Sequence, residues 1–492
     1  MRPNNMRWAG TCALGAVLTL STGCDFADDL LKVDNPEEIQ IEALNDPALL
    51  DVQLNGVVDA FQGIYGNDII EFNNYPTDEV ITGRNWETHA RGNQRLLSYE
   101  EAPTNGFWEG LNRGLRLGDG LAERIRGWAT DDPSTDFSEA LATSLVFAGY
   151  SATVLAENFC QAVISPDPDN PSGTVLEQPQ VFEVAIPYLT EAHDIATANG
   201  YTDLADLART GLARANRGRA NWTEAANWAN QVTVGFSWWL DYVDIDGGRN
   251  PLEGTSHGQN FSNGIHPNFT GVHPSFDGTG FAFTDDDVIA PQTDPRIQHE
   301  ITDATGHNAL TPLYKLFQGL RYSDYTGNTI APASAACPNC TGTLSSDMPL
   351  IAEFDTDILL ADYVEAQHHY FEALAMQGGN DAVVLAFVNA RRAVGNQVAV
   401  TLSGQALLTE LRNQRGRDLF MGGFRLPDLR RWTRNDPGNG PFDAGSYFPT
   451  GIHPNAQWGA YGEWTCYPIP VQEYNGNVNL QRPANPTVPP AI

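Results

Sequence analysis

Apolar residues recur along much of the chain at the spacing of an α-helix. In the clearest stretch, from about 138 to 161, successive apolar positions are separated by four, three, four, three and four residues: Leu141, Leu145, Ala148, Ala152, Leu155 and Phe159. That spacing places all of them on one helix face. Leu359 to Leu374 and Val383 to Val394 show the same period. The pattern therefore predicts a protein built mainly from α-helices.

Two more helices are expected at about 203–217 and 221–234, separated by a short turn that contains Gly218. Each has one apolar face that it cannot bury alone, so the two helices are expected to pack against each other. Trp222 followed by Ala225 resembles the start of the second helix of a tetratricopeptide repeat. A generic antiparallel helix pair explains the same pattern, and both interpretations stay open.

The helical period stops between about 240 and 350. A segment of this length is too long for a simple connection inside a compact domain, so it is either disordered or a structured functional insert. Its scattered aromatic residues favour order. The segment just before it, Phe236 to Tyr242, is also aromatic. This cluster is either core packing or a stacking platform for a sugar or peptide ligand.

The N-terminus has the features of an export signal. Arg2 and Arg7 precede an apolar run from Trp8 to Leu20, which is too short to span a bilayer, and Gly23-Cys24 follows. This ending resembles the lipobox of bacterial lipoproteins, with Cys24 as the acylated first residue of the mature chain. Ordinary signal cleavage is the alternative. No later stretch is expected to approach a membrane-spanning length.

Composition narrows the range of partners. The 492 residues include 28 Lys and Arg against 61 Asp and Glu, a formal charge of −33. Phosphate binding needs basic patches that this balance does not supply, which argues against nucleic acid as a partner. A chain of this length can bury enough surface without covalent cross-links, so its six cysteines do not indicate a scaffold stabilised mainly by disulfides. Cys337 and Cys340 form a C-x-x-C pair, interpreted as a local disulfide, two free thiols or half of a zinc site.

Three short motifs suggest catalysis or metal binding, and none has the required context. Gly254-Thr255-Ser256-His257-Gly258 matches the G-x-S-x-G of serine hydrolases, but no strand precedes it and no helix follows. Asp244 and Asp246 lack the later ligands of a calcium loop. Four residues on one helix lack the H-E-x-x-H pattern of zinc enzymes and are expected on a solvated or packing face: Glu365, His368, His369 and Glu372. We therefore expect no catalytic residue, metal or cofactor.

The C-terminal third carries the most specific sequence. A helix containing Leu408 to Phe420 is expected to pair its arginines with acids, and a short turn then leads to a second helix start. Two motifs stand out there. The first comprises Arg415, Asp418, Leu419, Gly423, Arg425, Asp428, Leu429, Arg431 and Trp432, and the second comprises Pro468, Ile469, Pro470, Glu473, Asn477 and Leu480.

Together these motifs resemble the SusD/RagB family of nutrient-binding outer-membrane lipoproteins. The sequence departs from the family pattern at Gln414 and at Met421-Gly422, where acidic residues are usual, which puts local ion pairing in question. The resemblance implies an all-α fold of tetratricopeptide-like helix pairs with a long loop-rich insert. It also implies a SusC-type TonB-dependent transporter as partner, and capture of oligosaccharide or peptide by aromatic stacking and hydrogen bonds, without catalysis.

The resulting expectation is a surface-exposed lipoprotein, anchored in the outer membrane, that binds nutrients for uptake. Residues 1–23 would be the signal peptide, 24–45 an acylated tether, and 46–492 a single SusD-like domain with its insert at about 240–350. A lipid-anchored hydrolase of the same polymers is the alternative, since paired carboxylates cannot be excluded by spacing. A structural surface protein is a third interpretation.

The ligand-binding candidates are aromatic and polar residues expected in loops near the helical repeats. Stacking of a sugar face on an aromatic ring supplies apolar contact, while amides and carboxylates bond the hydroxyls. The candidates are Asn73, Tyr75, Asp78, Arg84, Trp86, Trp238, Trp239 and Tyr242.

Overall fold

The computed structural model describes residues 41–82, 87–100, 102–164, 172–245, 247–252, 263–270, 275–276, 281–282, 294, 296–305, 312–319, 355–454, 458–483 and 485. The chain divides into two units, Met1–Leu49 and Leu50–Ile492. In the first unit, residues 41–49 hold two short 3-10 helices, η1 (Ile41–Asn45) and η2 (Pro47–Leu49). The second unit carries every other element described below.

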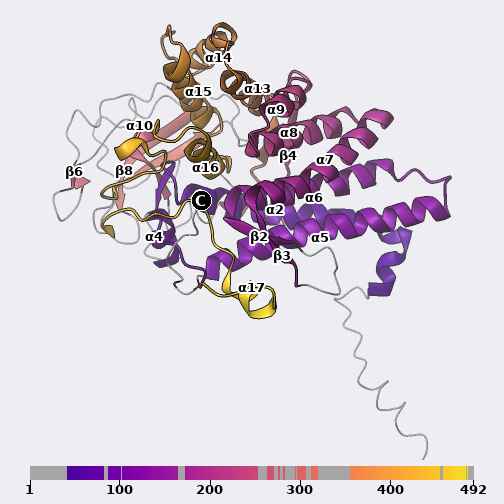
Figure 1. The fold of residues 1–492 in the computed structure, drawn as a ribbon. Coiled ribbons are helices and arrows are strands. Elements are labelled where there is room, and N and C mark those ends of the chain that lie inside the picture. The colour runs from indigo at the N-terminus through magenta and orange to yellow at the C-terminus, as the bar shows by residue number, and fades with distance from the viewer. Residues whose placement is uncertain are drawn as a thin grey trace, which may run out of the picture. The chain divides into compact units, whose positions relative to one another are not determined.

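Helices dominate this second unit, as the periodicity predicts (Figure 1). The expected all-α class is confirmed. The helices are α2 (Leu50–Ile64), η3 (a π-helical turn, Tyr65–Ile69), α3 (Ile70–Asn74), α4 (Glu87–Asn93), α5 (Ala102–Asp131), α6 (Ser138–Asn158), α7 (Gln178–Asn199), α8 (Thr202–Gly218), α9 (Trp222–Ala229), α10 (Pro267–Thr270), α13 (Tyr363–Gln377), α14 (Asp381–Val394), α15 (Gly404–Asp418), α16 (Arg425–Asn435), η5 (Asp443–Gly445) and α17 (Val471–Gly476).

The strands within the described residues form antiparallel pairs that join distant segments of the chain. These pairs are β1 (Val80–Thr82) with β5 (Asn263–Ile265), β2 (Gln161–Ile164) with β3 (Thr174–Glu177), β4 (Ser237–Leu240) with β10 (Ile358–Asp362), β6 (Ser275–Phe276) with β7 (Phe281–Ala282), and β8 (Ile297–Thr305) with β9 (Pro312–Gly319). The described parts of the predicted insert therefore contain secondary structure, and β5 ties one of them to β1.

Helices α5 to α9 pack in chain order, each against the next, and α13 packs on α9 (Figure 1). Local sequence sets their ends. Glu177 and Gln180 form a capping box at the start of α7, and Gly200 ends it with φ of +79°. The carboxylate of Asp362 accepts a hydrogen bond from the Glu365 amide at the start of α13. In this stack, capping residues thus lie at the ends of the helices whose apolar faces pack together.

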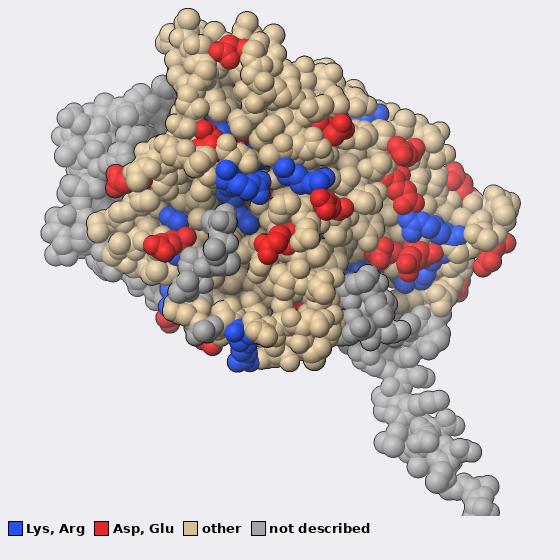
Figure 2. Space-filling view, in the orientation of Figure 1, with Lys and Arg blue, Asp and Glu red and all other residues tan. Residues whose placement is uncertain are grey.

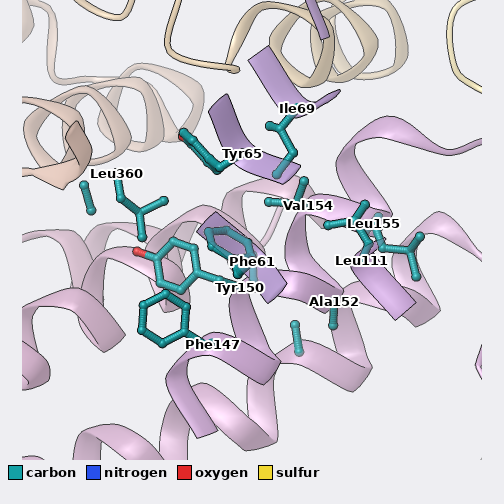
Figure 3. Close-up of a cluster of buried hydrophobic side chains, with 14 of the residues drawn as sticks. Phe61, Tyr65, Ile69, Leu111, Phe147, Tyr150, Ala152, Val154, Leu155 and Leu360 are labelled. Carbon is teal, nitrogen blue, oxygen red and sulfur yellow. The ribbon is translucent and has the colours of Figure 1, made fainter. Parts of the chain in front are cut away.

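Small residues set how closely the stacked helices approach. Gly149 of α6 lies against Leu189 of α7, and a Cβ on this glycine would meet the Leu189 Cγ at 2.5 Å. Leu189 belongs to the largest apolar core among the described residues. Figure 3 shows the centre of that core, where Phe61 of α2 meets Phe147 and Tyr150 of α6. The absence of a side chain at Gly149 is therefore required for the α6–α7 contact.

The predicted pair at 203–217 and 221–234 exists as α8 and α9, although α9 ends at Ala229, earlier than expected. Gly218 is the last residue of α8 and serves a different purpose from the predicted turn. A Cβ there would lie 2.4 Å from the ring of Phe182. The left-handed turn residue is Ala220, with φ of +60°. The glycine is thus needed for packing against α7.

Helix α6 corrects one expectation about the membrane. It is long and apolar enough to span a bilayer, whereas no segment of that kind was expected after the leader. However, 78% of its apolar window is buried inside the protein. Its composition is explained by its position between α5 and α7, where both faces are covered.

A disulfide joins Cys160, just after α6, to Cys466 near the C-terminus. The bond links residues 306 positions apart, and the nearby backbone pairs Phe159 with Tyr467. Sequence spacing does not suggest this pairing, because the two closest cysteines in the chain are Cys337 and Cys340. That C-x-x-C pair lies outside the described residues.

Candidate ligand-binding site

Two of the predicted site residues, Asn73 and Tyr75, are fully buried. The Asn73 side chain donates to the Asn158 side chain at 3.0 Å and accepts from the Leu426 amide at 3.0 Å. The Tyr75 hydroxyl donates to the carboxylate of Glu71. Asn73 therefore joins α3 to α6 and α16, and neither side chain faces solvent.

A third predicted site residue, Asp78, is also buried and forms a bidentate ion pair with Arg425. Both N···O distances are 2.7 Å, and Asn268 donates a third hydrogen bond at 3.1 Å. Burial alone would raise the pKa of Asp78, but Arg425 outweighs it and holds the pKa below its ordinary value. Asp78 thus fixes the start of α16 against the segment before β1.

These placements correct the expectation that Asn73, Tyr75 and Asp78 reach a ligand from a loop near the helical repeats. Their polar groups are bound by protein partners, because a buried polar group without a partner is costly. The other early candidates, Arg84 and Trp86, lie outside the described residues, as does the lipidation candidate Cys24. Their roles stay predictions.

The remaining candidates lie on and just after β4. Trp238 and Trp239 are half-buried, and their strand pairs with β10 through Ala361 and Leu359. Tyr242 is 5% exposed, and its hydroxyl donates to the Gln62 carbonyl at 2.9 Å. Tyr242 is therefore corrected to a core residue, whereas the stacking role of Trp238 and Trp239 stays a prediction.

A groove between α9 and α13 combines aromatic rings with amide side chains. Its volume is about 580 Å³, within the range of small-molecule sites. Trp228 of α9 and Tyr370 of α13 supply the rings. The polar groups come from Thr223, Glu224, Asn227, Asn230, Gln231 and Gln377, and Ala226 and Leu374 complete the lining.

Small residues beneath the groove bring the two helices together. Ala225 and Ala226 of α9 contact Ala373 of α13 in a small apolar cluster. Each groove ring is backed by another ring: Trp228 lies edge-on to His193 at 5.0 Å between centroids, and Tyr370 lies edge-on to Phe371 at 5.1 Å. These contacts orient the two rings. Exposed amides lie beside them, and that of Gln231 donates to the Asn227 carbonyl at 2.9 Å.

This groove has the chemistry that sugar recognition requires. A ring face offers apolar contact to the C–H groups of a pyranose, and each amide offers both donors and an acceptor to hydroxyl groups. Sequence reasoning missed it, because Trp228 and Tyr370 are 142 positions apart. The available signal was the run Asn227-Trp228-Ala229-Asn230-Gln231, in which an aromatic residue is flanked by amides.

The C-terminal motif residues have a different role, since they form a buried ionic cluster. The ionic cluster comprises Arg217, Glu372, Arg415, Asp428 and Arg431, all at most 3% exposed. Arg431 contacts Glu372 at 2.7 Å and Asp428 at 3.0 Å, and Arg415 contacts Asp428 at 2.6 Å. Arg217 of α8 lies 3.3 Å from Asp428. The predicted pairing of arginines with acids is confirmed here.

The charges of the ionic cluster control the pKa values of its acids. Burial would raise the pKa of Asp428, but Arg415, Arg217 and Arg431 together lower it well below its ordinary range. For Glu372, burial is likewise outweighed, chiefly by Arg431, so its pKa is also lowered. Both carboxylates are therefore ionised at neutral pH and hold α8, α13, α15 and α16 together.

Gln414 stands where the family pattern usually has an acidic residue, and both polar atoms of its side chain have hydrogen-bond partners. Its amide oxygen accepts from Arg296 at 2.9 Å, and its amide nitrogen donates to Gln397 at 2.7 Å and to Glu410 at 2.8 Å. At the second departure, the Met421 amide donates to buried Glu79 at 3.0 Å. Protein partners thus replace the acids that the family pattern would supply.

The four residues considered for metal binding are buried by packing. His368 bonds Asp418 at 2.7 Å, and His369 bonds Glu365 at 3.1 Å. Burial is the main cause that lowers the pKa of both histidines, which favours their neutral form. Within the part of the chain that the structure describes, no group of three or more His, Cys, Asp or Glu residues is arranged to hold a metal.

Comparison with known proteins gives matches in structure alone. No family model matches the sequence, and no curated protein matches it. A SusD-like carbohydrate binding protein from Bacteroides fragilis NCTC 9343 superimposes with a TM-score of 0.60 at 14% identity, covering 89% of this chain and 99% of its own. A SusD superfamily protein from Bacteroides vulgatus ATCC 8482 gives 0.57 at 14% identity, with 88% and 98% covered.

A laminarin binding SusD-like protein gives a TM-score of 0.53 at 15% identity, covering 89% of this chain and all of its own. Identities this low establish the fold and leave the ligand open. The match extends over almost the whole of each solved chain. The chain therefore has the SusD-like fold, as its C-terminal motifs predicted.

Proposed function

We propose that this chain is a lipid-anchored outer-membrane protein that binds oligosaccharides at the cell surface and passes them to a SusC-type TonB-dependent transporter. One observation carries the proposal: 89% of the chain matches the fold of SusD-like proteins, among them one named for binding carbohydrate and one for binding laminarin. The acylation rests on the lipobox that ends at Cys24. The partner rests on the family resemblance of the C-terminal motifs.

The α9–α13 groove supports saccharide binding independently of the fold. Its two rings and several amides suit a neutral sugar, and one carboxylate, Glu224, lies among its lining residues. Trp238 and Trp239 remain the second candidate surface. Peptide capture is the competing outcome, because amides and aromatic rings also bind extended backbone.

Binding is tested with the mature chain and a panel of oligosaccharides and peptides in isothermal titration calorimetry. We expect saccharide binding that Trp228→Ala and Tyr370→Ala each weaken about tenfold, the scale of a lost stacking contact. Trp238→Ala tests the second surface in the same assay. Circular dichroism shows whether each variant is folded. Binding of peptides but no saccharide would contradict the proposal.

The hydrolase alternative is separated by product analysis. Incubation of the protein with the saccharide that it binds should release no new reducing ends, because a receptor returns its ligand unchanged. Appearance of reducing ends at a rate proportional to protein concentration would favour the hydrolase.

The anchor and the transporter are tested in cells. Labelled palmitate should enter the wild-type chain and not Cys24→Ser, and the labelled protein should fractionate with the outer membrane. Affinity purification from that membrane should recover a large β-barrel. An unacylated chain in the cytosol would overturn the proposed location.

A further inference from the structure

A second cavity lies beside the disulfide, between the start of α7 and the outer face of α16. Its volume is about 210 Å³. The walls come from Cys160, Gln161, Glu177, Gln178, Pro179, Arg430, Thr433, Arg434, Thr465 and Cys466. Because ligand pockets usually measure about 300 to 1,000 Å³, this cavity suits one chemical group or one terminal sugar, and not a whole oligosaccharide.

Two arginines of α16, one helical turn apart, contribute to the walls. Arg430 donates from Nη1 to the carbonyl oxygens of Ala156 and Glu157. Arg434 donates to the Gln178 side chain at 2.6 Å and to the Gly218 carbonyl. Neither guanidinium makes an ion pair within the described ranges. These neutral contacts fix both side chains. Glu157 favours the charge of Arg430 electrostatically, but its carboxylate is already paired with Arg214 at 2.6 Å.

This pair differs from the other arginines of the same helix. Arg425 and Arg431 each contact a carboxylate within 3 Å. An unpaired cation next to another cation is unfavourable when it is partly removed from water. Burial and the neighbouring Arg434 lower the pKa of Arg430 to about 9, which still leaves it charged at neutral pH.

The other groups on the cavity wall also favour an anion. Thr433 and Thr465 supply hydroxyl groups, and the first turn of α7 begins at Gln178, where the helix dipole is positive. The one acid on the wall, Glu177, is engaged by the Gln161 side chain at 2.7 Å and by the capping box. Figure 2 shows basic side chains gathered on the surface beside α16.

We infer that the cavity lined by Arg430 and Arg434 binds one anionic group, a carboxylate or a sulfate ester, carried by a saccharide. Guanidinium groups recognise both anions with charge-assisted hydrogen bonds. The saccharide part of this inference rests on the proposed function, whereas the anion part rests on the cavity alone. The site would make the protein selective for acidic glycans, such as those with uronic acid or sulfated residues.

The test measures binding of four probes to the mature chain by calorimetry: inorganic sulfate, a uronic acid oligosaccharide, a sulfated oligosaccharide and a neutral oligosaccharide. We expect Arg434→Gln to weaken binding of the charged probes about tenfold or more and to leave the neutral probe unchanged, since only a charged group gains a charge-assisted hydrogen bond from the guanidinium. The relative affinities of the two acidic saccharides distinguish carboxylate from sulfate.

Two further variants complete the test. Arg430→Gln should have the same effect, and Arg434→Gln remains informative if loss of the Arg430 contacts with α6 prevents folding. The matched control is Arg219→Gln, which removes a surface arginine already paired with Glu183 at 2.7 Å. This control should retain full affinity for all four probes.

The outcomes separate this inference from the proposed function. Sulfate binding that requires Arg434, without any saccharide binding, would keep the anion site and overturn the saccharide receptor. Neutral saccharide binding with no preference for charged probes would keep the receptor and overturn the anion site. Sulfate affinity that persists in both arginine variants would also overturn the anion site.

Discussion

The helix stack α5 to α8 and the ionic cluster hold neighbouring parts of one compact unit by opposite means. In the stack, α6 and α7 meet through small and aliphatic residues such as Gly149, Ala185 and Leu189. In the ionic cluster, α8, α13, α15 and α16 meet through arginines and carboxylates that are equally buried. Burial alone therefore does not distinguish the two regions.

The difference lies in how each region specifies its contacts. Apolar packing is non-directional and tolerates many substitutions of similar volume. A buried carboxylate requires its own arginines in place, because an uncompensated charge in the interior is very costly. We infer that the stack supplies most of the favourable burial, whereas the ionic cluster selects the single arrangement in which α16 meets α8 and α13.

Removing one charge from the ionic cluster should have the largest effect. Asp428→Ala leaves Arg415, Arg431 and Arg217 without their shared partner, and we expect a loss of about 3 to 5 kcal/mol in the free energy of unfolding. Urea denaturation followed by circular dichroism measures it. Glu183→Ala, which breaks the exposed pair with Arg219, should change stability by about 1 kcal/mol or less. Equal losses in both variants would show that burial adds nothing to this cluster.

Crowding the stack should have a smaller effect. Gly149→Ala places a methyl group 2.5 Å from Leu189, and such overpacking is expected to cost about 1 to 3 kcal/mol. The matched control is Gly127→Ala on α5, where the added methyl group meets no atom within 4 Å. It should be neutral or slightly stabilising, because alanine is the better helix former. Thermal unfolding compares the two, and a neutral Gly149→Ala would mean that α6 and α7 separate without cost.

The pH dependence of stability should show the smallest effect for a single step of one pH unit, and it separates paired acids from an unpaired one. Asp428 and Glu372 have lowered pKa values, so the stability that they contribute is present above about pH 4 and is lost in acid. Glu79, which makes no ion pair among the described residues, behaves oppositely. Burial raises its pKa from 4.5 to about 8, so the stability that it contributes is complete below about pH 4.5 and is lost as pH rises toward 8.

Between pH 5 and pH 8, ionisation of Glu79 should therefore lower the free energy of unfolding by at most about 1.4 kcal/mol per pH unit. In Glu79→Gln, the free energy of unfolding should depend less on pH in this range. The loss of stability in acid, below about pH 4, should be unchanged. Urea denaturation at intervals of one pH unit measures the free energy of unfolding in both pH ranges. An unchanged slope between pH 5 and pH 8 in this variant would show that Glu79 is ionised in the folded protein.

Much of the fold followed from local pattern. The helices α6, α8 and α14 lie where the apolar period predicted them, since one-sided burial imposes that period on the sequence. The helix predicted from Leu359 begins only at Tyr363, because Ile358–Asp362 pairs with β4 as strand β10. The C-terminal motifs predicted the SusD-like fold by resemblance, and three of their residues, Arg415, Asp428 and Arg431, belong to the ionic cluster. The prediction that Asn73, Tyr75 and Asp78 bind a ligand from a loop was wrong. The sequence around a polar residue does not show whether a partner is buried with it.

The sequence by itself determined the helical class, the pairing of α8 with α9, and the arginines and acids that the C-terminal helices would have to match. Only the tertiary structure decided which charges meet, that Cys160 joins Cys466, and that Trp228 faces the same groove as Tyr370. It also decided that Arg430 and Arg434 line a cavity without an acidic partner among the described residues. The physical reason is range: helix formation and capping act over a few residues, whereas these contacts join segments that only the packed core brings together.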